Sequence, residues 1–160
     1  QAIADFVVQL HRAGMSPESA RRLPEILRLA RYYETATDAA AEAVSAGAKG
    51  EVNLPEAHDF RLAAQGLLDQ CRAAAAQTAA ESLAAARTAM EGSYQQLKAR
   101  LLEAGASEHL AVTTMDAHLR AASALHRALE QVAKAASMCI GPKPPNMFTN
   151  PQVGAGETTM

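Results

Sequence analysis

The sequence has no tryptophan, and only 4% of its 160 residues are aromatic. It also has no excess of positive charge, because 15 Lys and Arg residues are offset by 17 Asp and Glu residues, for a net charge of −2. Proteins that bind nucleic acid need a basic surface, and single strands are usually also held by aromatic side chains. We therefore expect no nucleic-acid partner.

Long apolar runs are also missing, because charged residues interrupt every apolar stretch within a few positions. A membrane-spanning helix needs about 20 predominantly apolar residues, so no part of this sequence is expected to cross a bilayer. The chain has no secretory signal pattern and begins with Gln1 instead of Met. We expect it to be part of a longer protein.

Cysteine is scarce, and Cys71 and Cys139 are far apart, without the spacing of metal ligands. We expect two reduced thiols in a cytosolic domain, although a disulfide between them stays open. The sequence also lacks a glycine-rich phosphate loop, a Gly-x-Ser-x-Gly turn and an HExxH motif. These absences favour a protein that is not an enzyme.

Alanine and apolar residues at helical spacing are abundant, and no segment has the alternation of a strand. A short amphipathic helix is predicted at 2–13, and a longer one at 17–45. Pro24 either kinks the second helix or marks its true start near residue 23. No proline follows between 56 and 104, a span too long for one helix in a compact domain.

We therefore predict a break in this span near 77–81, where Thr78 and Glu81 fit a capping box. The last helix is predicted at about 108–137. Together these segments predict an all-α antiparallel bundle of about five helices at 1–138, joined by short loops. The Pro- and Gly-rich tail at 139–160 is expected to be irregular, either disordered or packed on the bundle through Met147 and Phe148.

The most informative segment lies at 31–38, within the second predicted helix. Its carboxylates, Glu34 and Asp38, lie one helical turn apart, the first on the predicted inward stripe and the second just beyond its edge. Such a pair either holds a cation with oxygen ligands from elsewhere or is neutralised. In the second case Glu34 pairs with Arg31 or a neighbouring helix, and Asp38 is solvated. The inward positions predicted for this helix are Leu23, Ile26, Leu27, Ala30, Tyr33, Glu34, Thr37, Ala40, Ala41 and Val44.

Two histidines of the last predicted helix are further candidates. His126 and Glu130 lie one turn apart and form a candidate pair of metal ligands, the alternative being a histidine at the core edge that bonds to a neighbour. His118 is the nearest match to the histidine of a phosphotransfer module. That function requires His118 to be exposed.

At residues 31–38 the pattern Arg-x-x-Glu-x-x-x-Asp resembles the E(D)xxxD motif of PhoU-type phosphate-uptake regulators. Residues 23–34, 94–102 and 119–134 resemble the PhoU-like cytosolic C-terminal region of bacterial Na⁺/phosphate cotransporters. The resemblance covers about 2–138. It implies three-helix units, here one complete unit and part of another, whose motif helices lie side by side.

The resemblance implies a regulatory domain of a phosphate-uptake protein at the cytoplasmic face of the cell membrane. Its partner would be the membrane transporter portion of the same protein, which this chain lacks. Some family members bind metal through the acidic motifs, which implies a divalent or ferric ion at Glu34 and Asp38, with Glu130 as a weaker ligand. Lys134 stands where the second motif should have its other acid, and an ammonium group disfavours a cation. The alternative is an internal charge pair in which Lys134 neutralises Glu34 or Asp38.

A bundle with an incomplete unit exposes apolar surface, which predicts a homodimer or docking to the transporter portion. Two other functions stay open. One is a helical signalling or scaffold bundle without any link to phosphate, in which the acids are ordinary ion-pair partners. The other is the histidine phosphotransfer module.

Overall fold

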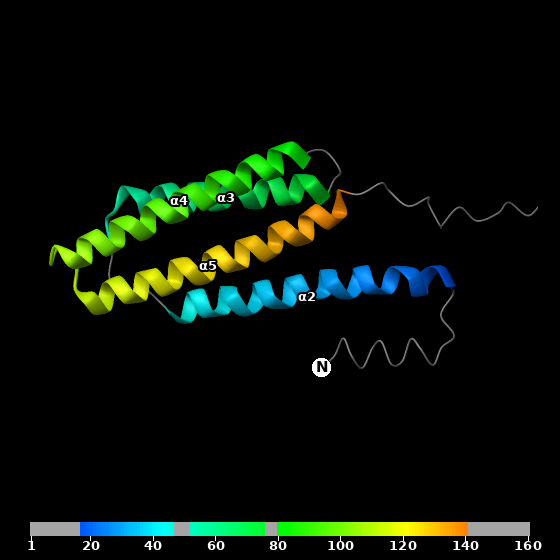
Figure 1. Cartoon of the computed structure of the whole chain (residues 1–160), viewed down its shortest axis with the longest axis horizontal. Helices are drawn as coiled ribbons and strands as arrows, with labels where there is room; N and C mark the ends of the chain where they lie inside the picture. Colours follow the sequence, from blue (N-terminus) through cyan, green and yellow to red (C-terminus); the bar gives the residue numbers. More distant parts are fainter. Residues whose placement is uncertain (1–16, 47–51, 76–79, 141–160) are drawn as a thin grey trace, which may run out of the picture.

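The structure is a computed structural model that describes residues 17–46, 52–75 and 80–140. These residues form four helices and no strand: α2 (Pro17–Ser45), α3 (Pro55–Ala75), α4 (Ala80–Ala106) and α5 (Val112–Cys139). Each helix runs antiparallel to the next along the chain (Figure 1). The predicted all-α bundle is thus confirmed. The helix predicted at 2–13 and most of the predicted tail lie outside the described residues.

The break predicted within the long proline-free span is confirmed. Helix α3 ends at Ala75 and α4 begins at Ala80. Residues 76–79, which include Thr78 of the expected capping box, lie outside the described part of the chain. The two helices fold back against each other (Figure 1).

The start of one helix was predicted correctly, and that of another was not. Helix α2 begins at Pro17, as predicted, and continues through Pro24, so the alternative start near residue 23 is wrong. Helix α5 begins at Val112 instead of 108, because Glu108 has a φ of 57°, a left-handed conformation that cannot belong to a right-handed helix.

The hydrophobic core lies between α3, α4 and α5, and no residue of α2 whose burial is described belongs to it. Its largest fully buried side chains are Leu67, Met90 and Leu101. Burying one such side chain contributes about 1.5–3 kcal/mol. The buried core residues are Phe60, Ala64, Leu67, Cys71 and Ala74 of α3; Leu83, Met90, Tyr94, Leu97 and Leu101 of α4; and Ala122, Leu129, Ala133 and Ala136 of α5.

Helix α2 packs on a different face of α5, through small residues. Among the described residues of α2 only Ala36 and Ala39 are buried, and α5 has three buried alanines outside the core: Ala124, Ala128 and Ala135. We call these five residues the alanine seam. Because alanine ends at Cβ, the two backbones approach closely, and α2 with α5 is the most extensively packed helix pair.

The inward stripe predicted for α2 is therefore wrong in the second half of the helix, whereas Leu23, Leu27 and Ala30 of the first half are half-buried. Glu34 and Thr37 are exposed, and Val44 is 82% exposed. The face turned to α5 carries Ala36 and Ala39 instead. A close-packed interface with an alanine face selects the small residues of α2 and leaves its bulkier apolar residues outside.

Helix α2 also extends past the end of α5 (Figure 1). The guanidinium of Arg127 pairs with the carboxylate of Glu42 at 2.7 Å, which aligns the second half of α2 with the middle of α5. Since the helices are antiparallel, the first half of α2 lies beyond the last turn of α5. Ile26, in this half, is 54% exposed.

Candidate functional site

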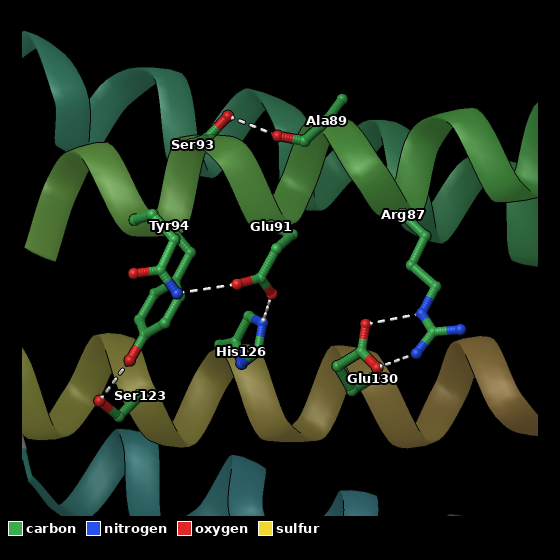
Figure 2. A network of polar contacts seen from close by, with 9 residues as sticks. Arg87, Ala89, Glu91, Ser93, Tyr94, Ser123, His126 and Glu130 are labelled. Carbon is green, nitrogen blue, oxygen red and sulfur yellow. Dashed lines mark hydrogen bonds and ion pairs between the residues drawn. The ribbon is translucent and has the colours of Figure 1, made fainter.

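A network of polar contacts joins α4 to α5 (Figure 2). The three contributing residues of α4 are separated by four and then three positions, and those of α5 by three and then four positions. Because the two helices are antiparallel, this mirrored spacing places each residue level with its partner on the other helix. Sequence reasoning did not detect this network, although the mirrored spacing was visible in the sequence. We call it the polar seam, and it consists of Arg87, Glu91 and Tyr94 on α4 with Ser123, His126 and Glu130 on α5.

Arg87 and Glu130 form a two-pronged ion pair at one end of the polar seam. The Nε of Arg87 donates to Oε1 of Glu130 at 2.8 Å, and Nη2 donates to Oε2 at 2.5 Å. The Glu130 side chain is only 17% exposed. The hydrogen bonds from Arg87, reinforced by its charge, lower the pKa of Glu130. Both carboxylate oxygens are thus engaged by a cation.

His126 and Glu91 form the middle of the polar seam. The Nε2 of His126 lies 2.5 Å from Oε2 of Glu91, and the amide of Gln95 donates to Oε1 at 2.8 Å. The hydrogen bond from Gln95, followed by that from His126, lowers the pKa of Glu91. The imidazole stacks on Tyr94, with ring centroids 4.3 Å apart, and the Tyr94 hydroxyl lies 2.9 Å from Oγ of Ser123.

This arrangement holds two helices in one register more readily than it holds a ligand. A shallow pocket of about 430 Å³ lies over the polar seam, but each carboxylate in it already has its own donor. The prediction that His126 bonds to a neighbour at the core edge is confirmed. In the described part of the chain, no three His, Cys, Asp or Glu side chains are placed to hold a metal ion together.

The substitution Glu130→Gln should lower the free energy of unfolding by about 1 kcal/mol at pH 7, less than for a fully buried pair because Arg87 is half exposed. Since the folded-state pKa of Glu130 is lowered, ionised Glu130 stabilises the folded protein at pH values above the ordinary glutamate pKa. This stabilisation is lost as the pH falls through the folded-state pKa. The difference between the two proteins should therefore shrink as the pH falls below the ordinary glutamate pKa and vanish below the lowered pKa of folded Glu130. Urea unfolding at several pH values measures it.

The matched control is Glu103→Gln, which removes an ion pair with Arg100 on the exposed side of α4. This change should alter the free energy of unfolding by less than about 0.5 kcal/mol at any pH. If both variants lost the same free energy of unfolding at every pH, a structural role for the charge of Glu130 would be contradicted.

The structure places the predicted metal ligands on different sides of the molecule. Glu34 and Asp38 are exposed on α2, and neither has an ion-pair partner within the described residues. Glu130 faces α4 and is occupied by Arg87. Helices α2 and α5 do lie side by side, but the pair that joins them is Arg127 with Glu42, and the charge of Lys134 acts on Glu130. The acids of the two predicted motifs are therefore not brought together.

The structure also places the two cysteines and His118. Cys71 and Cys139 are both free thiols, as expected, and burial raises the pKa of Cys71. His118 is half-buried, and its Nε2 is shielded from water without a hydrogen-bond partner. It lines a cleft on the other side of α5 from the polar seam.

No protein-family model matches this chain, and no characterised protein or solved structure matches it either. Among the described helices, none has the length and apolar character that crossing a membrane requires. The resemblance to PhoU-like domains therefore stays a prediction.

Proposed function

We propose that this chain is a non-enzymatic regulatory domain that acts on a partner protein through α2. The partner under this proposal is the membrane transporter portion of a Na⁺/phosphate cotransporter-type protein, and the domain lies at the cytoplasmic face of the membrane. The proposal is carried by one observation. Helix α2 extends past α5 and carries uncovered apolar residues beside two acids that lack a partner within the described chain.

The apolar part of this surface supports docking. Ile26 is 54% and Tyr33 50% exposed, and their spacing of seven residues puts them on one face of α2. Apolar residues that gather on a surface mark sites of protein contact more often than scattered ones do. The transporter portion, or a second copy of this chain in a homodimer, would cover them.

The charged part of the surface defines what the partner must supply. Glu34, Asp38 and Glu42 follow one another at single-turn spacing, and Arg127 neutralises only Glu42. Glu34 and Asp38 therefore favour either basic side chains of the partner or a divalent or ferric ion. A single helix cannot complete the coordination of such an ion, so the partner would provide its other ligands.

The phosphotransfer alternative has less support. Transfer to a histidine requires that a ring nitrogen reach the phosphorylated group of another protein. His118 is half-buried in the bundle instead of standing exposed in the middle of a helix surface, so it lacks the exposure that a phosphotransfer histidine requires. A scaffold bundle without any link to phosphate remains the alternative that the experiment below separates.

The double substitution Glu34→Ala and Asp38→Ala, made in the full-length protein in its own cells, should uncouple regulation from transport. We expect the decrease in radiolabelled phosphate uptake after phosphate is restored to be weakened about five-fold or more, the range of ordinary coupling energies. The matched control is Glu25→Ala, an exposed acid on the same helix, which should leave regulation unchanged.

Uptake that is regulated normally in the double variant would contradict the proposed link to phosphate. Elemental analysis of the purified full-length protein tests the metal separately. Metal that is present in the wild type and lost in the double variant assigns the ion to Glu34 and Asp38. Equal metal content in both proteins leaves the basic-partner form of the proposal.

A further inference from the structure

An apolar cleft of about 400 Å³ lies between α2 and the three-helix core. Helices α2 and α3 both pack against α5, but they do not pack extensively against each other, so α5 forms the floor between them. The walls are apolar and come from all four helices: Val44 of α2, Phe60 of α3, Leu97 and Leu101 of α4, and Leu125 of α5. Its volume falls within the range of small-molecule sites, about 300–1,000 Å³.

Among the described residues, the ionisable side chains that line this cleft are Arg61 and His118, and no carboxylate of the described part lines it. Both of these groups donate hydrogen bonds, and Arg61 carries a permanent positive charge. The Nε2 of His118 is shielded from water and has no hydrogen-bond partner. A buried polar atom without a partner costs about 1–3 kcal/mol, so its presence beside a cavity calls for an explanation.

We propose that this cleft binds a small amphipathic carboxylate, such as a medium-chain fatty acid. The acyl chain lies against the apolar walls, and the carboxylate accepts hydrogen bonds from His118 and Arg61. The χ2 torsion of histidine is broad and roughly two-fold, and the proposal requires the imidazole to rotate so that Nε2 faces the bound carboxylate. The occupant follows from charge complementarity, because a cleft with apolar walls and the positive charge of Arg61 in its lining fits an organic anion better than a neutral lipid or a basic peptide.

This inference is independent of the proposed regulatory function. The cleft uses the second half of α2, parts of α3 and α4, and the first half of α5. The proposed regulatory surface uses Glu34, Asp38 and the exposed apolar residues Ile26 and Tyr33. Either can fail without the other.

The first test blocks the cleft. Sodium decanoate, below its micelle concentration, is titrated into the full chain by isothermal titration calorimetry. Ala40 lines the cleft from an exposed position, whereas its neighbour Ala41 is exposed but does not line it. Ala40→Phe should abolish the binding seen with the wild type, and Ala41→Phe should preserve it.

The second test examines the polar end. His118→Leu should weaken decanoate binding about tenfold or more, since a hydrogen bond to a charged group contributes about 1.5–3 kcal/mol. It should leave the binding of decanol unchanged, because decanol has no carboxylate. Arg61→Gln should also weaken decanoate binding, whereas Arg72→Gln, on the same helix but outside the cleft, should not.

Three results would overturn the proposal. The first is a wild-type chain that does not bind decanoate, and the second is equal binding by the Ala40 and Ala41 variants. The third is a dimer, seen by sedimentation, that only the Ala40 variant dissociates, because it would assign the cleft to a second copy of this chain. Thermal unfolding of each variant establishes that it is folded before the titration.

Discussion

Leu67→Ala should lower the free energy of unfolding by about 2–5 kcal/mol. The Leu67 side chain has no exposed surface and lies in the core between α3, α4 and α5. Because protein interiors are close-packed, its neighbours relax only partly into the space that the substitution leaves, and the resulting cavity adds to the loss of apolar burial. Urea unfolding followed by circular dichroism measures the change.

The adjacent residue provides the control. Leu68 is 36% exposed and lies outside the core, so Leu68→Ala should lower the free energy of unfolding by less than about 1 kcal/mol. The two variants have the same composition and nearly the same helix propensity. Equal losses in the two variants would mean that α3 is rotated differently in the bundle.

Ala39→Leu should have the second large effect, because it places a bulky side chain in the alanine seam. Overpacking of this kind typically costs about 1–3 kcal/mol. The described residues of α2 contribute nothing to the hydrophobic core, so the strain is relieved most easily when α2 separates from α5. Hydrogen exchange should therefore show a loss of protection in α2, while the amides of α3, α4 and α5 keep most of theirs.

Ala41→Leu is the matched change on the exposed side of the same helix. It should alter stability by no more than about 0.5 kcal/mol and leave the exchange of α2 unchanged. If Ala39→Leu destabilised all four helices equally, α2 would be an integral part of the core and not a separable layer on α5.

These expected results follow from one arrangement of the four helices. Three helices form a core, the polar seam fixes α4 against α5, and α2 is attached through alanines and the pair of Arg127 with Glu42. A helix that contributes no described residue to the hydrophobic core is the element that a partner can reposition most readily. The proposed regulatory surface lies on that helix, and the proposed carboxylate cleft lies beneath it.

The helices themselves were readable from the sequence, because the signals for them are local. Helical spacing of apolar residues, the scarcity of proline and the small turn residues predicted the all-α fold, and the break before Glu81 was placed within a few residues of where α4 begins. The late start of α5 was missed. The left-handed conformation at Glu108 has no distinctive residue type to announce it.

The orientation of the helices was not readable in the same way. Leu67 and Leu68 are adjacent leucines of one helix, and the packing of three helices selected Leu67 for the core. For α2 the apolar pattern favoured a stripe with Glu34 on it, but the alanine face of α5 selected Ala36 and Ala39. Glu130 was a candidate metal ligand until the fold placed Arg87 opposite it, 43 positions earlier in the chain. Helix type follows from neighbours in sequence, whereas the partner of each side chain depends on which faces pack most closely, and only the folded bundle establishes that.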